Sequence, residues 1–127
     1  MRNTIYWVEI PVLHFERAKK FYETVFAIEI ELVPNTRGKE GKYGIFPLDP
    51  AALGGGAAII EGEGYMPSAK GALPYIDRGE DLAIPLARVE EAGGTIVKPK
   101  SENGGRKGFI AIFIDTEGNK IGLHSNN

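Results

Sequence analysis

The chain has 127 residues, a formal net charge of -2 and no cysteine. This length favours one domain (1–127), which would bury roughly two thirds of the surface that its unfolded chain exposes. The lack of cysteine excludes disulfides and thiolate chemistry, and charges interspersed without a Lys/Arg block argue against nucleic acid as a partner. No apolar run approaches the ~20 residues of a membrane helix and no export signal is visible, so we expect a cytoplasmic protein with no membrane partner.

The first half of the chain reads as a strand, a helix and three further strands. Residues 5–12 alternate between a purely apolar face and a face that combines Trp7 with Glu9. Apolar residues recur at helical spacing over 18–25 and predict an amphipathic helix that covers the apolar face of the first strand. The remaining strands are expected at 27–33, 43–47 and 57–61, with a polar loop at 34–42.

The second half repeats this order after a glycine-rich connector, 61–73. A helix is expected to begin at Glu80 or Asp81 and to end at the pair Gly93 and Gly94. Strands are expected at 73–77, 95–98, 109–114 and 120–125, with a loop at 99–107. We therefore predict an α+β fold in which two βαβββ modules occupy about residues 1–61 and 72–127.

Two motifs carry a resemblance to a known superfamily. VLHFERAKKFY (12–22) resembles the V-x-D-x-x-x-A-x-x-F-Y signature of the glyoxalase, bleomycin-resistance and extradiol-dioxygenase superfamily (vicinal oxygen chelate fold), with His14 where Asp is usual. DTEGNKIGLHS (115–125) resembles its D-P-[DE]-G-N strand-turn-strand motif, and 74–100 looks like the subgroup described as predicted lactoylglutathione-lyase-related proteins. The resemblance implies curled, mixed or antiparallel sheets around a cavity, commonly in a homodimer.

The same resemblance bears on metal binding. Metal enzymes of the superfamily hold their ligands on inward strand faces, and by register two of the four positions fall on Trp7 and Gly122. Neither side chain can ligate a metal, and a catalytic metal needs about three protein ligands. We therefore expect no metal and no cofactor at this centre.

Glu9 is the strongest catalytic candidate, because a carboxylate beside Trp7 could serve as a general base or acid. It could equally be the structural partner of an Arg or Lys from the facing module. Trp7 could stack against a planar ligand, or it could complete the core in place of a metal site.

His124 shares strand parity with Gly122, so it could pair with Glu9 or carry a proton in the same cavity. The alternative is a partly exposed histidine near the end of the chain. His14 is expected to start the helix rather than to bind a ligand. Tyr43 and Tyr75 are candidate pocket-lining residues, together with Trp7 and Gly122.

These features predict a protein that acts on or binds a small molecule. One hypothesis is a metal-independent isomerase or lyase, related to lactoylglutathione lyase, with Glu9 and His124 as catalytic residues. The second is a binding protein of the bleomycin-resistance type that carries out no chemistry. A third is a pocket kept only as a structural core.

Overall fold

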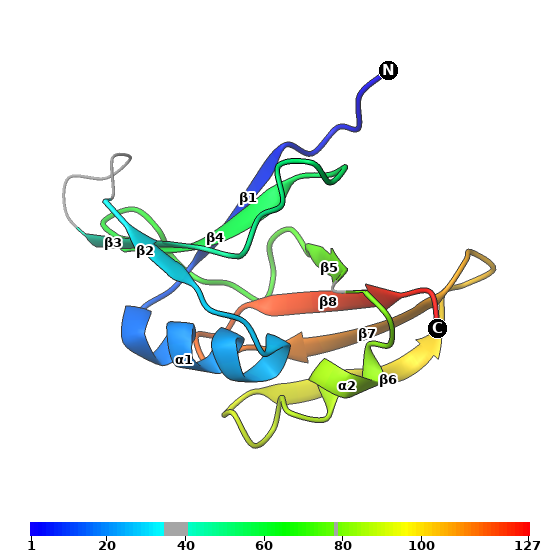
Figure 1. Ribbon diagram of the computed structural model, residues 1–127. Helices are drawn as coiled ribbons and strands as arrows, with labels where there is room; N and C mark the ends of the chain where they lie inside the picture. The colour runs from blue at the N-terminus through cyan, green and yellow to red at the C-terminus, as the bar shows by residue number, and fades with distance from the viewer. Residues whose placement is uncertain (35–40, 78) are drawn as a thin grey trace.

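The two halves of the chain have the same order of elements in the computed structural model, which describes residues 1–34, 41–77 and 79–127 (Figure 1). The first module contains β1 (Trp7–Pro11), α1 (Phe15–Phe26), β2 (Glu31–Val33), β3 (Gly41–Ile45) and β4 (Gly56–Gly62). The second contains β5 (Tyr75–Asp77), α2 (Ala83–Leu86), β6 (Thr95–Glu102), β7 (Phe109–Ile114) and β8 (Lys120–Ser125).

Strand pairing gives two mixed sheets with matching topology. One sheet has the order β1-β4-β3-β2 and the other β5-β8-β7-β6. In each module the first and last strands pair in parallel, and all other neighbours pair antiparallel. The α+β class and the repeated βαβββ order predicted from the sequence are therefore confirmed. Most of the predicted loop 34–42 lies outside the described residues.

Two predicted boundaries in the second module are wrong. The α-helix spans only Ala83–Leu86, and the chain then continues in turns stabilised by bonds such as Arg88 N–H to the Pro85 carbonyl. Pro85 falls in the first turn of this helix, where proline is tolerated. Beyond Leu86 the bonds shift to the i→i−3 spacing, as in Val89 N–H to the Leu86 carbonyl, so the chain forms 3₁₀-like turns instead of an α-helix. The predicted loop 99–107 is strand as far as Glu102, with register shifts against β7. Within the described residues, no helix is long and apolar enough to cross a membrane.

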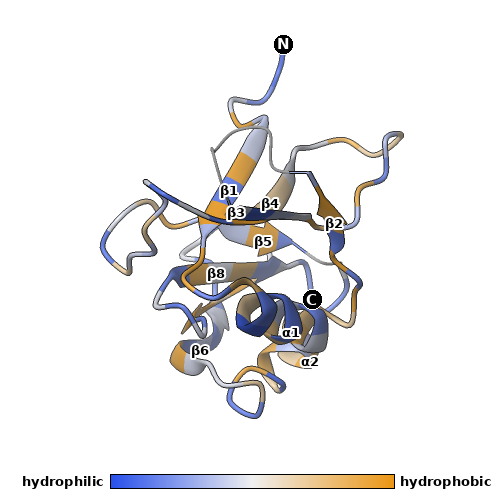
Figure 2. Ribbon diagram, turned by 90° about the vertical axis from the view of Figure 1, so that its left-hand side faces the viewer, coloured by the Kyte–Doolittle hydropathy of each residue, from blue (hydrophilic) through white to orange (hydrophobic). Residues whose placement is uncertain are grey.

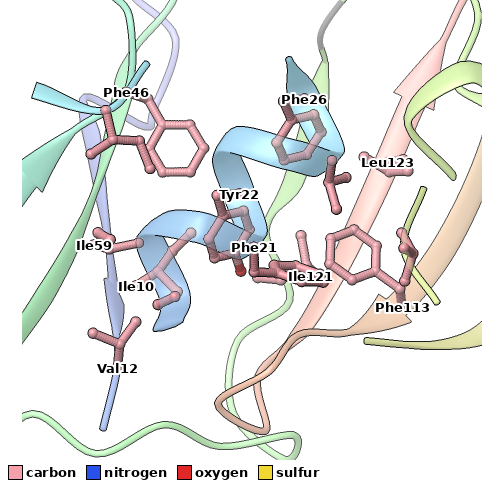
Figure 3. Packing of buried hydrophobic residues seen from close by; sticks show 14 of the residues in the cluster. Ile10, Val12, Phe21, Tyr22, Phe26, Phe46, Ile59, Phe113, Ile121 and Leu123 are labelled. Carbon is pink, nitrogen blue, oxygen red and sulfur yellow. The ribbon is translucent and has the colours of Figure 1, made fainter. Parts of the chain in front are cut away.

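A continuous hydrophobic core joins the two modules. Figure 3 shows α1 between the sheets, with Phe21 and Tyr22 at the centre of the cluster. Tyr22 packs edge-on against Phe46 of the first module, whereas Phe21 contacts Phe113 of β7. The amphipathic helix predicted at 18–25 thus packs against both sheets rather than covering β1 alone.

The turn between β7 and β8 ties the second module to the first. Asp115 is 4% exposed and accepts hydrogen bonds from the Tyr22 hydroxyl (2.5 Å) and from the backbone N–H of Asn119 (2.9 Å). The Asn119 amide donates to the Pro11 carbonyl (2.7 Å) and its oxygen accepts from the Ser68 N–H (3.0 Å). Burial and the nearby Asp115 raise the pKa of Tyr22 well above its ordinary value.

Glu117 of the same turn caps the start of α1. Its carboxylate accepts from the N–H groups of Leu13 (2.9 Å) and His14 (2.8 Å) and pairs with Arg17 (2.8 Å). These groups are among the donors that a helix start leaves unsatisfied. Burial opposes the charge of Glu117, but the hydrogen bonds from Arg17, His14 and Thr116 outweigh it and lower its pKa. His14 begins the helix as predicted, and accepts weakly from the Arg17 N–H (3.4 Å).

The edge strands β1 and β5 bring the two sheets together. Both views show β5 between β1 and β8, and in Figure 2 the helices α1 and α2 lie side by side (Figures 1 and 2). Strand β1 carries alternating hydrophobic and hydrophilic bands in Figure 2, as the sequence predicts. Its apolar residues Ile10 and Val12 enter the core, which leaves Trp7 and Glu9 on the opposite face.

Replacing Asn119 with alanine should destabilise the protein strongly. The substitution removes the side-chain bonds of Asn119 to the Pro11 carbonyl, to the Ser68 N–H and to the buried carboxylate of Asp115. Loss of a partner costs about 1–3 kcal/mol for a buried group and less for an exposed one such as Ser68. Chemical denaturation should show this loss, whereas the exposed control Asn126→Ala should unfold close to the unmodified protein. Equal stability of the two variants would contradict a clamping role for the turn.

Candidate functional site

A chain of hydrogen bonds runs across one face of the first sheet. The Trp7 indole N–H donates to the Tyr43 hydroxyl (2.9 Å), and this hydroxyl donates to Oε2 of Glu9 (2.8 Å). An indole N–H can only donate, so the tyrosine accepts from Trp7 and directs its own proton to the carboxylate. The structure therefore brings together three of the residues singled out in the sequence, Trp7, Tyr43 and Glu9. Tyr43 is buried (4% exposed), so its hydroxyl holds the Glu9 carboxylate in position from the protein interior.

Strand register explains why these side chains meet. Trp7 and Glu9 pair with Gly56 and Ala58 of β4, which separates β1 from β3. Both β4 residues are small, so the long side chains from the flanking strands can reach one another across it. A Cβ at Gly56 would lie 2.7 Å from Cζ3 of Trp7, so a larger residue there would displace the indole.

Glu9 also lines a hollow between the two modules, which we call the junction hollow. Its volume is ≈ 570 Å³, within the range of small-molecule pockets. Only Glu9 and Lys120 among its lining residues carry a formal charge at neutral pH. The remaining walls are apolar, small or neutral polar, and are formed by Ile5, Val8, Ile10, Pro11, Met66, Ser68, Gly71, Ala72, Leu73, Pro74, Tyr75, Asn119 and Ile121.

Gly122 allows Tyr75 to form part of this wall. The two residues are paired on neighbouring strands, and a Cβ at Gly122 would lie 2.4 Å from the Tyr75 ring. The ring therefore lies over the glycine, where the superfamily resemblance would place a metal ligand. Tyr75 lines the junction hollow, whereas Gly122, covered by that ring, and the buried Tyr43 are not among its lining residues.

His124 lies on the same strand face as Gly122 but has other partners than Glu9. Its Nδ1 is 2.9 Å from Oδ2 of Asp77, and its Nε2 is 3.2 Å from the Lys107 carbonyl oxygen. Both ring nitrogens thus face acceptors, which favours the doubly protonated ring. The hydrogen bond to Asp77 makes the largest contribution to raising the pKa of His124 above its ordinary value, and the bond to the Lys107 carbonyl makes the next largest.

A second hollow, of ≈ 550 Å³, lies on the other side of this junction. Trp7 and Asp77 both line it, beside the loop that contains Leu48 and Asp49. Trp7 and the partner of His124 therefore share one hollow, whereas Glu9 and Tyr75 share another. The expectation that Trp7, Glu9 and His124 line a single cavity does not hold. Glu9 lines the junction hollow and Trp7 lines the second hollow, whereas His124 lines a small third one beside Leu82 and Pro85 of the α2 region.

The residues at the expected metal centre do not fit a metal. Trp7 directs its only polar atom to Tyr43, and Gly122 is covered by Tyr75. Among the described residues there is no group of three or more His, Asp or Glu side chains that could hold a metal ion. The chemistry proposed below therefore uses side chains of the protein.

Sequence reasoning missed two residues of this region. Asp77 occupies the β5 position paired with His124, and Lys120 occupies the same face of β8 as Gly122. Strand parity was the available signal for Lys120, because residues 120, 122 and 124 alternate onto one face. The partner of His124 required knowledge that β5 pairs with β8.

Asp77→Asn should lower the pKa of His124 toward its ordinary value of 6.5. A histidine whose pKa is raised on folding contributes its full stabilisation below pH 6.5, the pKa in the unfolded chain. This contribution disappears as the pH rises through the higher pKa of the folded protein. The chain has only two histidines, so proton NMR can follow His124 with His14 as the internal reference. An unchanged His124 titration in Asp77→Asn would contradict the pairing.

Comparison with known proteins gives a fold likeness. No protein-family model and no curated protein matches the sequence. A glyoxalase/bleomycin resistance protein from Albidiferax ferrireducens T118 is similar in structure, with a TM-score of 0.73, 20% identity and coverage of 98% of this chain and 100% of that chain. The fosfomycin resistance protein FosX from Listeria monocytogenes, in its tetragonal crystal form, matches with a TM-score of 0.63, 16% identity and coverage of 100% of this chain and 94% of that chain.

A mutant glyoxalase I from Zea mays is also similar, with a TM-score of 0.66 and 20% identity. The match covers 95% of this chain but 45% of the maize protein, so this chain corresponds to about half of that enzyme. The predicted glyoxalase-like fold is therefore confirmed by structure. At these identities the likeness concerns the fold.

Proposed function

We propose that this chain is a small-molecule protein of the glyoxalase and bleomycin-resistance type, with the junction hollow as its site and Glu9 as a proton acceptor. The observation that carries the proposal is the position of Glu9, which Tyr43 holds at the wall of a largely apolar hollow. Apolar hollows with few polar groups are typical of ligand sites. The motif resemblance to lactoylglutathione-lyase-related proteins adds that the reaction is an isomerisation or lyase step.

The chemistry available to Glu9 is proton transfer. A carboxylate fixed at one oxygen by Tyr43 can receive a proton from an acidic C–H next to a carbonyl group and return it to the neighbouring carbon. Such a step needs only that the substrate place its C–H near the carboxylate. No metal or cofactor is part of this proposal.

Binding without chemistry is the second candidate. The specific observation in its favour is the placement of His124, whose ring nitrogens bond to Asp77 and Lys107 rather than to a residue of the junction hollow. Glu9 would then act as a hydrogen-bond acceptor for a ligand, as a binding protein of the bleomycin-resistance type requires. The cysteine-free composition favours a cytoplasmic location for either function.

Glu9→Gln separates these two functions. If Glu9 is the base, incorporation of solvent deuterium into α-hydroxyketones and α-hydroxyaldehydes should fall about 10²-fold or more, as expected for loss of a general base. NMR in deuterium oxide measures the exchange, and the exposed Glu63→Gln is the matched control. Thermal unfolding should change little in either variant.

The outcomes are distinct. Ligand binding by the unmodified protein without any deuterium exchange would favour the binding function. Exchange that persists in Glu9→Gln would contradict the role of Glu9 as the base.

We also propose that the protein forms a twofold homodimer through the surface around β1. Large apolar residues are exposed there in unusual number, namely Ile5, Tyr6, Leu48, Leu53, Met66 and Tyr75. Self-complementary twofold interfaces are the commonest closed assembly. Light scattering at micromolar concentration should give twice the chain mass, and Tyr6→Glu should reduce it; a monomeric mass for the unmodified chain would contradict the proposal.

A further inference from the structure

We propose that the junction hollow selects an apolar monocarboxylate, whose anionic group is held by Lys120 while its body faces Glu9. This inference rests on the proposed function only in taking the hollow as the binding site. The observation behind it is a lysine of unusual placement, which lines the same hollow as Glu9 but belongs to the other module.

Lys120 is half-buried at the first position of β8. Lysine is mostly exposed in proteins and is rarely buried without a partner. Within the described residues, Lys120 takes part in no ion pair, whereas the half-exposed Lys100 and Arg17 each bind a carboxylate. Glu9, although it lines the same hollow, is held by Tyr43. The ammonium group of Lys120 is therefore available to an anionic ligand.

The position of Lys120 is fixed by its neighbour in the chain. Asn119 donates to the carbonyl of Pro11, two residues beyond Glu9 on β1, and is itself 5% exposed. The start of β8 is thus held against the end of β1, which fixes the backbone that carries Lys120 relative to the strand that carries Glu9. A site built on such fixed backbone can orient a ligand with little loss of conformational entropy.

The rest of the wall defines the ligand class. Apart from these two charges, the hollow is bounded mainly by apolar residues such as Met66, Leu73 and Tyr75, which suit an aliphatic or aromatic body. One lysine balances one negative charge, and the described lining offers no second cation for another. A monocarboxylate therefore fits, whereas a phosphate monoester with two negative charges does not.

The two methionines of the chain provide a site-specific probe. Met66 lines the junction hollow, and Met1 lies fully exposed at the N-terminus. In protein labelled with methyl-13C methionine, a ligand that enters the hollow should shift the Met66 resonance and leave that of Met1 in place. The probes are 3-phenylpropanoate, its neutral amide 3-phenylpropanamide, and phenyl phosphate.

We expect 3-phenylpropanoate to shift Met66 in a saturable manner and to bind more tightly than the amide or phenyl phosphate. Lys120→Gln should weaken binding of the carboxylate about tenfold or more, the usual worth of a charged hydrogen bond. Binding of the amide should change by less than about twofold. Lys98→Gln removes the same charge from the same sheet outside the hollow, and should leave both affinities unchanged.

Three results would overturn the inference while leaving the hollow as a site. One is carboxylate binding that Lys120→Gln does not weaken, a second is equal weakening of carboxylate and amide, and a third is binding of the amide but not of the carboxylate. If none of the three probes shifts Met66 in the unmodified protein, the junction hollow is not the binding site and the proposed function falls as well. Circular dichroism of each variant shows whether it is folded.

Discussion

The hydrogen bonds between the β7–β8 turn and the junction of β1 with α1 hold the structure together. Asp115, Glu117 and Asn119 are almost fully buried, yet each finds partners in the first module. A buried carboxylate loses its hydrogen-bond partners when the geometry changes, so these bonds add a directional constraint to the close packing of the core. The relative position of the two sheets, and with it the width of the junction hollow, thus depends on this polar clamp.

The spacing of apolar residues predicted helices and strands correctly wherever the face that it marks as apolar is the face that is buried. The run 109–114 and the amphipathic helix around Phe21 both appear as expected, because each buries an apolar face. The second module departs from the pattern at two places. The bonds beyond Leu86 shift to the i→i−3 spacing and end α2 after one turn, and Pro99 lies within β6, an edge strand whose register against β7 shifts. An edge strand needs hydrogen bonds on one side only, so it accepts a proline that reads as a loop in the sequence.

The candidate site was predictable only in part, because strand parity gives the face of a residue but not its neighbours. Parity placed Trp7 and Glu9 together, but it also predicted His124 in the same cavity, whereas His124 bonds to Asp77 and lines another hollow. The bond from Trp7 through Tyr43 to Glu9 depends on the small β4 residues that let side chains cross that strand. The partner of His124 depends on the pairing of β5 with β8, which no local pattern reveals.

The motifs that carry the superfamily resemblance are the residues that build the clamp. The turn DTEGN supplies Asp115, Glu117 and Asn119, and the helix motif supplies Arg17 and Tyr22, which bind them. These residues bond one βαβββ module to the other. Their presence in a sequence therefore indicates the fold and gives no information about the reaction. The chemistry must reside at positions the motifs leave open. This chain has Trp7 and Gly122 at two of them. Glu9 and Lys120 line the junction hollow, and Lys120 takes part in no ion pair within the described residues, which is the arrangement behind our proposal of an organic anion as the ligand.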